Sequence, residues 1–327
     1  MKVKFWGVRG SIPSPGPKTM KVGGNTTCVE ICPGGDRQFI IDAGTGIREL
    51  GLNMMGRGNV GTVRAHLFMT HTHWDHIHGF PFFVPAFIPG NQLTIVGPVS
   101  AKEKTLEQVI KDQMDYEYFP VPLKALGSKI RFEQLEAGNY EFEGVKTRVE
   151  YLNHPVTTVG YRFEFEGKTV VTQFDSEQFF NPFDQEQASG GGDDMDDFLF
   201  GDADLGPTPE SEAYDDKKVH AEADSEVEMQ NRKLIDFARD ADLVIFDAQY
   251  TGEEYPPKKG WGHSTIDDAI HVATEANVKR LAFFHHDPTR TDKMIEEMED
   301  YIKNKLRRME RKDVHIFAAR EGMEIDC

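Results

Sequence analysis

The stretch MTHTHWDHIHG, residues 69–79, contains four of the twelve histidines of the chain and an aspartate. It overlaps the end of RAHLFMT, residues 64–70, an apolar run that predicts a β-strand. Four side chains able to bind a metal follow this strand: His71, His73, Asp75 and His76. A loop at the end of a rigid strand can aim such groups into one pocket, and imidazole with carboxylate suits zinc, manganese or iron. The stretch therefore predicts a metal site, with its ligands divided between two neighbouring ions.

Three other predicted strands also end in groups that can bind a metal. His154 follows the strand VEYL, Asp175 ends KTVVTQFD, and RLAFFHH ends in His285 and His286. Two ions need more ligands than residues 69–79 supply, so we expect these strand ends to converge on that stretch.

The periodicity of the whole chain predicts an α/β protein. Period-2 or fully apolar strand runs occupy residues 2–8, 26–31, 38–44, 64–70, 128–135, 140–154, 159–175, 242–248, 280–286 and 314–319. Helical spacing occupies residues 100–114, 229–240, 265–276 and about 290–310. Thr265 and Asp268 form a capping-box pattern at the start of the third helix. The pattern predicts two sheets faced by helices.

The acidity of the chain is concentrated in one segment. The net charge is -18, and residues 181–230 hold 16 Asp and Glu against 2 Lys. A glycine triplet and dense like charge predict a mobile insert on a single domain that spans residues 1–327. The alternative is a calcium-binding or partner-docking segment built on clustered aspartates, namely Asp193, Asp194, Asp196 and Asp197.

Composition also indicates where the protein works. No stretch approaches 18 apolar residues, and the N-terminus has no apolar segment before a small-residue cleavage site. Cys28, Cys32 and Cys327 are too few and too irregular for a disulfide framework. We therefore expect a cytoplasmic protein without a membrane span. The sequence leaves open whether it is a monomer or a homodimer.

Seven motifs together carry a resemblance to a known family: FWGVRGSIPSPGP, GGNTTC, IIDAGTGIRELG, THTHWDHIHGFPFF, DAQYTGEEY, GWGHST and FFHHDP. They resemble the metallo-β-lactamase-fold hydrolases, specifically the phosphodiesterase branch related to ribonuclease Z. The resemblance covers about residues 1–180 and 231–327. It implies a four-layer αββα sandwich with a dinuclear metal site at one edge of the two sheets.

The resemblance also implies a ligand set for two divalent ions, zinc in the first place, with manganese or iron as alternatives. Carried over by motif, the ligands are His71, His73 and His154 for one ion, Asp75, His76 and His285 for the other, and Asp175 between them. His285 is preferred because it directly follows the apolar LAFF, and His286 is the alternative. Asp42, at the end of an early strand, is expected to orient the ligand loop.

Two such ions would make a shared water acidic enough to act as a hydroxide nucleophile and would bind the oxygens of a phosphodiester. Asp75 is expected to orient this hydroxide together with Asp175. Asp247 and His263 occupy the places where ribonuclease Z-like enzymes pair a carboxylate with a histidine. We expect His263, poised by Asp247, to donate a proton or bind phosphate. The alternative is a core aspartate and a helix-capping histidine.

The substrate is less visible in the sequence. No cluster of Lys and Arg accompanies the motif, and the acidic insert opposes binding of a polyanion, so a small phosphodiester such as a cyclic nucleotide is expected rather than a long nucleic acid. Ribonuclease Z-like RNA 3′-end cleavage is the first alternative. Hydrolysis of thioesters or lactams and a non-catalytic metal-binding scaffold are the others.

Two further features have two interpretations each. Four phenylalanines offer either an apolar lip for a nucleobase or ordinary core packing: Phe80, Phe82, Phe83 and Phe87. Arg290 either pairs with phosphate or belongs to the charged start of the last helix.

Overall fold

The computed structural model describes residues 1–100, 104–183 and 216–327. The central part of the predicted insert, including the aspartates at 193, 194, 196 and 197, lies outside these ranges. The chain divides into two compact units. The larger unit comprises Met1–Glu177 and Ile235–Cys327, and the smaller unit comprises Gln178–Leu234.

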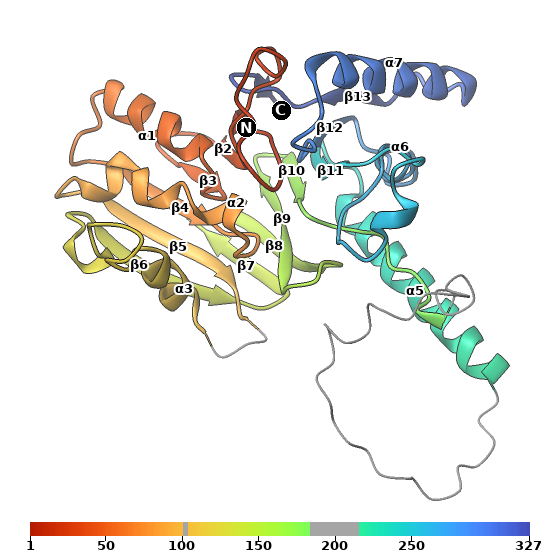
Figure 1. Cartoon of the computed structure of the whole chain (residues 1–327), viewed down its shortest axis with the longest axis horizontal. Coiled ribbons are helices and arrows are strands. Elements are labelled where there is room, and N and C mark those ends of the chain that lie inside the picture. The colour runs from red at the N-terminus through yellow and green to blue at the C-terminus, as the bar shows by residue number, and fades with distance from the viewer. Residues whose placement is uncertain (101–103, 184–215) are drawn as a thin grey trace, which may run out of the picture. The chain divides into compact units, whose positions relative to one another are not determined.

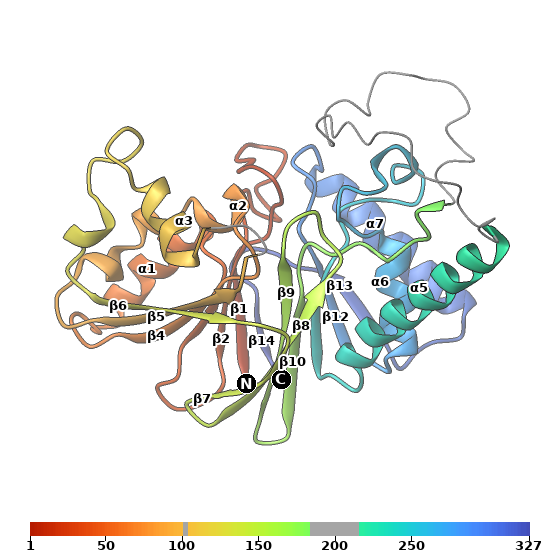
Figure 2. The ribbon, with the colours of Figure 1, turned by 90° about the horizontal axis from the view of Figure 1, so that it is seen from below.

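In the described part of the larger unit, the strands form two seven-stranded sheets (Figures 1 and 2). The first sheet has the order β14 (Glu324–Asp326), β1 (Lys2–Gly7), β2 (Cys28–Cys32), β3 (Phe39–Ile41), β4 (Arg64–Phe68), β5 (Gln92–Pro98), β6 (Lys129–Leu135). The second has the order β13 (His315–Ala318), β12 (Arg280–Phe284), β11 (Leu243–Asp247), β10 (Lys168–Gln173), β9 (Thr158–Phe165), β8 (Val145–Leu152), β7 (Gly138–Phe142). Strands β3 to β6 are parallel to one another, and so are β10 to β13.

The short strand β3 shows why these runs become sheet. Successive side chains point to opposite faces of a strand. Phe39 and Ile41 therefore enter the core between the two sheets, while Ile40 enters the core on the outer face of the first sheet. The rings of Phe39 and Phe163 lie 5.5 Å apart between centroids, which joins the two sheets across the inner core.

Helices cover the outer faces of both sheets. In the first sheet, apolar residues of α1 (Gly46–Gly56) and α3 (Leu106–Gln113) share the outer core with β3, β4 and β5. Helices α6 (Ile266–Glu275) and α7 (Asp292–Arg308) contact β11, β12 and β13 of the second sheet. This arrangement confirms the predicted αββα sandwich. The capping box of Thr265 and Asp268 is also confirmed, with both reciprocal hydrogen bonds present.

Several short elements complete the described chain. They are α2 (Trp74–Ile77), η1 (Phe80–Phe82), η2 (Val84–Phe87), η3 (Leu123–Ala125) and η5 (Pro256–Lys258). Among the described residues, none of the helices combines the length and apolar content needed to cross a bilayer.

Some elements differ from the sequence predictions. The runs 140–154 and 159–175 are each two antiparallel strands, because Glu143–Gly144 and Glu166–Gly167 take left-handed backbone conformations and close tight turns. The predicted helix at 229–240 begins earlier, since α5 spans Asp216–Ala238. Residues 216–228, predicted as part of a loop, are thus helical. Their high charge favours a loop prediction, but they also contain Ala, Glu and Lys, which are strong helix formers.

Candidate metal centre and acid–base pair

The predicted metal ligands lie together at one edge of the larger unit. Strands β3 and β4 are parallel, as are β10, β11 and β12, so polar groups that follow these strands gather at common sheet edges. Three groups of possible metal-binding residues result, and the first two are the candidate ligand groups: His71, His73, His154 and Asp175; Asp75, His76, Asp175 and His285; and Asp175, Asp247, His263 and His285. Within each group the ligand atoms lie within 4.8 Å of one another.

His76 and His285 are each held by one ring nitrogen and offer the other. His76 Nδ1 lies 2.8 Å from Asp42 Oδ2, while its Nε2 lies 3.2 Å from Asp175 Oδ2. His285 Nδ1 lies 3.2 Å from Gln249 Oε1, and its Nε2 lies 3.3 Å from Asp175 Oδ1. Such outer hydrogen bonds fix the tautomer and the ring orientation of a metal ligand.

His154 and Asp75 are also held by hydrogen bonds from outside the cluster. His154 Nδ1 donates to the carbonyl oxygen of Gly262 at 2.9 Å, and its Nε2 lies 3.1 Å from His73 Nδ1. The backbone N–H of Ser11 donates to Asp75 Oδ2 at 2.7 Å. The carboxylate of Asp75 is therefore oriented by the loop after β1.

Asp42 is fully buried and organises the start of the histidine loop. Its two oxygens accept hydrogen bonds from the backbone N–H and the hydroxyl of Thr70, at 2.7 and 2.8 Å. Together with its contact to His76, this links the end of β3 to the loop after β4. Asp42 thus lies where the resemblance implied it should.

Backbone strain is concentrated in this region. Four residues of or next to the cluster have left-handed φ angles: Ser11 (63°), Asp42 (61°), Asp175 (45°) and His285 (58°). Such conformations cost free energy in residues with a β-carbon and persist where the surrounding structure holds them, often at functional sites. His285 directly follows β12 and Asp175 lies two residues after the end of β10, so a left-handed turn near each strand end sets the direction of the side chain.

Electrostatics prepare the cluster for cations. Burial, helped by the neighbouring His76, lowers the pKa of His71 well below its ordinary value, which keeps the imidazole neutral. Burial acts to raise the pKa of Asp175, but His285, His76 and His71 outweigh it and lower that pKa well below the ordinary value. His71 thus presents a neutral imidazole beside an ionised carboxylate, the protonation states that bind metal. At His76 burial acts to lower the pKa, but Asp175, Asp75 and Asp42 outweigh it and raise that pKa well above its ordinary value, so a metal ion would have to displace a proton there.

Two buried atoms further support a cation here. Within the described residues, His71 Nε2 and Asp175 Oδ1 are buried and make no hydrogen bond. Buried polar atoms that make no hydrogen bond are costly. A divalent ion bound among these nitrogen and oxygen atoms would satisfy both, so the residues present fit the metal that the fold implies.

The structure separates the two adjacent histidines. His285 lies in the cluster, whereas His286 Nε2 donates to the carbonyl oxygen of Ala319 at 2.9 Å and lies outside both groups. We expect His285→Ala to lose bound metal and diester turnover. His286→Ala should retain the metal and lower the free energy of unfolding by about 1–3 kcal/mol, through a lost hydrogen bond and a cavity. Metal analysis and thermal unfolding of the two variants provide the check. If His286→Ala lost its metal while His285→Ala kept it, His286 would be the ligand.

Asp247 and His263 form a pair beside the cluster. His263 Nδ1 lies 2.7 Å from Asp247 Oδ2, and the His263 ring stacks on that of His285 with centroids 4.9 Å apart. Burial acts to lower the pKa of His263, but Asp247 outweighs it and raises that pKa to about 9. The imidazole is therefore able to carry a proton at neutral pH.

The sequence did not reveal Glu177, which holds the loop that carries His263. Its buried carboxylate accepts hydrogen bonds from the backbone N–H groups of Gly260 and Gly262 and from the hydroxyl of Tyr255. Because Glu177 follows Asp175 by two residues, one strand end positions both a candidate ligand and the acid–base loop. The sequence shows only an acidic residue after a strand, and its partners lie about eighty positions away.

Two open interpretations are also resolved. Phe80 and Phe83 are buried in the outer core and Phe87 packs against it, so only Phe82 of the four is well exposed and the proposed aromatic lip is wrong. Arg290 is buried and forms a bidentate ion pair with Glu254, at 3.0 and 2.7 Å. The two terminal nitrogens of its guanidinium are thus already occupied.

No family model matches the chain. Curated proteins do match at moderate identity. The chain is 25% identical over 246 residues to ribonuclease Z of Nanoarchaeum equitans, which covers 73% of this chain and 72% of that one. It is 26% identical over 296 residues to ribonuclease Z of Staphylococcus carnosus, with 87% and 88% covered.

Solved structures share the fold over nearly the whole chain. Human tRNase Z, short form, has a TM-score of 0.59 at 18% identity, with 100% of this chain and 99% of that chain covered. A diphosphatase from the PhnP family has a TM-score of 0.59 at 16% identity, with 100% and 97% covered. Zinc-bound PqqB from Methylobacterium extorquens has a TM-score of 0.60 at 14% identity, with both chains fully covered. The chain is therefore a metal-dependent hydrolase of the metallo-β-lactamase fold, related to ribonuclease Z.

Proposed function

We propose that the chain is a dinuclear phosphodiesterase that hydrolyses a small diester, with cyclic nucleotides as the candidate class. The observation that carries this proposal is the convergence of two ligand groups that share Asp175, beside an Asp–His pair. The proposed ligands are His71, His73 and His154 for one ion, Asp75, His76 and His285 for the other, and Asp175 for both. Zinc is the proposed metal, supported by the zinc-bound state of PqqB.

Two bound ions would supply positive charge that acidifies a water and stabilises the phosphate oxygens. The chain supplies the remaining functions. Asp75 and Asp175 would orient the attacking oxygen. Asp247 accepts from His263 Nδ1, so Nε2 is the nitrogen that can deliver a proton to the departing oxygen.

Charge favours a small diester over a long nucleic acid. The chain carries a net charge of -18, and the buried Arg290 near the site is paired with Glu254. Binding of a long phosphate backbone depends on clustered Lys and Arg that displace counterions. RNA cleavage is the second candidate, because the relatives reported above are ribonucleases Z. Hydrolase relatives do not support a non-catalytic scaffold.

A substrate panel separates these candidates. The metal-loaded protein is given bis(p-nitrophenyl) phosphate, cyclic mononucleotides, cyclic dinucleotides, a precursor RNA, a chromogenic lactam and a thioester, and the chelated protein is the control. We expect turnover of the nitrophenyl diester and of a cyclic nucleotide, with weak dependence on salt. RNA cleavage that falls steeply with salt would instead establish the second candidate. Turnover of only the lactam or thioester, or absence of bound metal, would overturn both.

A further inference from the structure

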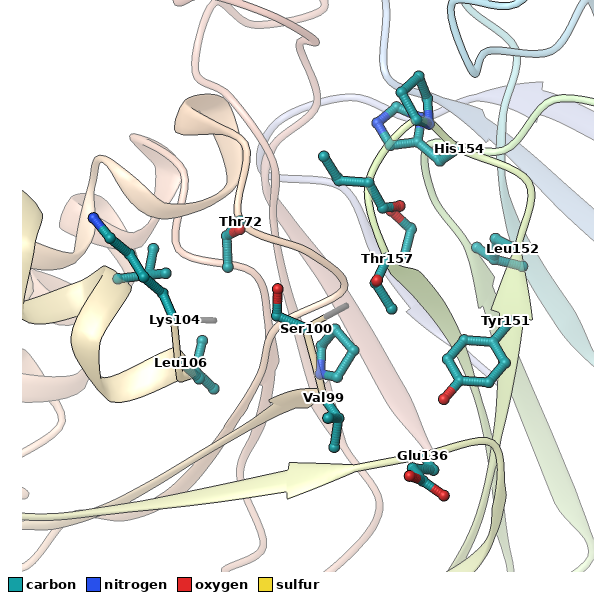
Figure 3. A pocket seen from close by; sticks show the side chains of 15 residues that line it. Thr72, Val99, Ser100, Lys104, Leu106, Glu136, Tyr151, Leu152, His154 and Thr157 are labelled. Carbon is teal, nitrogen blue, oxygen red and sulfur yellow. The ribbon is translucent and has the colours of Figure 1, made fainter. Parts of the chain in front are cut away.

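A large cavity opens beside the proposed metal centre. It has a volume of about 940 Å³, within the range of small-molecule sites. Thr72 and His154 line the end nearest the centre, and Figure 3 shows His154 facing the same space as Thr157 and Tyr151. Because His154 belongs to the first ligand group, a diester bound at the centre has this cavity as a neighbour.

Two apolar walls enclose the cavity. Val99 directly follows β5, and Leu106 and Val109 belong to α3. On the other side, Leu152 ends β8, and Pro155 and Val156 belong to the loop between β8 and β9. Walls of this kind release water when they receive an apolar or aromatic group. They offer nothing to the charged oxygens of a phosphate.

The polar groups of the cavity are mostly neutral. Hydroxyls of Thr72, Ser100, Tyr151 and Thr157 lie among the lining side chains, with one carboxylate, that of Glu136. Among the described lining residues, Lys104 is the only lysine or arginine, and its Nζ pairs with Asp112 at 2.7 Å. Such a lining suits a neutral ring with hydrogen-bonding edges and disfavours a second phosphate or an RNA backbone.

We infer that this cavity binds the nucleobase of a nucleoside that is esterified to the scissile phosphate. The inference rests on the proposed phosphodiesterase function and specifies its substrate class. A base would lie between the two apolar walls, with its polar edges toward the hydroxyls and Glu136. The phosphate would lie at the His154 end of the cavity.

The test compares two esters that release the same nitrophenolate. One is thymidine 5′-(p-nitrophenyl phosphate), and the other is methyl p-nitrophenyl phosphate, which has no base. We expect wild-type kcat/KM to favour the thymidine ester at least about tenfold, the size of a base-stacking contribution. Val109→Trp fills the cavity from α3, away from the ligand loops, and should abolish this preference while turnover of the methyl ester stays within about twofold.

Two further variants guard the interpretation. Val99→Trp fills the cavity from a site that is 39% exposed, so it tests the inference if Val109→Trp does not fold. Val60→Trp, at a position 60% exposed and outside the cavity, should keep the wild-type preference. An unchanged preference in a folded cavity-filling variant would overturn the inference.

Two more measurements separate the inference from the proposed function. If octyl p-nitrophenyl phosphate gains as much as the thymidine ester, the cavity binds apolar groups in general and the nucleobase inference fails. Calorimetry with thymidine 5′-monophosphate measures the cavity without turnover. Binding that Val109→Trp abolishes, without cleavage of any diester, would retain the cavity and overturn the phosphodiesterase. Cleavage of the methyl ester, with neither a preference for the thymidine ester nor binding of thymidine 5′-monophosphate, would retain the phosphodiesterase function and overturn the nucleobase inference.

Discussion

Replacement of Asp175 by alanine is expected to lower the bound metal from two ions per chain to one or none and to slow diester turnover by at least about 1,000-fold. Asp175 belongs to both proposed ligand groups and to the group that contains Asp247 and His263. Its oxygens lie 3.2 Å from His76 Nε2 and 3.3 Å from His285 Nε2. Asp175 is the residue common to these groups, so its replacement by alanine removes a negatively charged ligand from each of them.

Metal analysis, turnover and thermal unfolding together check this result. Chelation should lower the Tm of the wild type, since an ion that binds only the folded state stabilises it, and Asp175→Ala should lose most of this shift. Asparagine tolerates the left-handed backbone and keeps one side-chain oxygen. The metal content and the Tm shift of Asp175→Asn should therefore lie between those of the wild type and of Asp175→Ala. Asp300→Ala, at a side chain 73% exposed, is the matched control. Wild-type metal content and turnover in Asp175→Ala would refute the dinuclear assignment.

Replacement of His263 by alanine should slow a diester with an alkoxide leaving group by about 100- to 10,000-fold, the usual contribution of a general acid. The same change should affect a p-nitrophenyl diester much less, because nitrophenolate departs without a proton. His263 is 12% exposed and paired with Asp247, so its proton is held in place beside the cluster. Equal losses on the two substrates would show that His263 binds phosphate and does not donate a proton.

The Asp247→Asn variant tests the same pair through pH. Asp247 raises the pKa of His263, so its loss should lower that pKa. The protonated acid would then persist only to a lower pH. We expect the alkaline limb of kcat on the alkoxide substrate to move down by about 1–3 pH units. A limb that stays in place, or that moves up, would contradict the assignment.

The candidate ligands could be predicted because their signals are local. Each of them follows an apolar or alternating run, and parallel strands bring their carboxyl ends to one edge whatever the details of packing. For the same reason the αββα class followed from the order of strand and helix patterns together with the motifs. The capping box of α6 was local as well.

Other features depended on contacts that no pattern records. Glu177 acts on residues about eighty positions away, and Gln249 holds a ring nitrogen of His285. The charge of residues 216–228 predicts a loop, but these residues are helical and include strong helix formers. The sequence does not show whether Phe80 and Phe83 lie in the core or on a binding surface, because an apolar run is typical of both. The structure buries both of them.

The amino-acid sequence by itself determined which side chains can bind a metal and that they follow strands. The first depends on side-chain chemistry, and the second depends on the apolar and alternating patterns that identify the strands. The motif favoured His285 over His286, but the tertiary structure decides that His285 is the histidine that lies in the cluster. The left-handed turn at His285 directs one ring into the cluster, and the other is held by Ala319. It also decided which nitrogen each histidine presents, because that choice is made by partners from distant strands, such as Asp42 for His76.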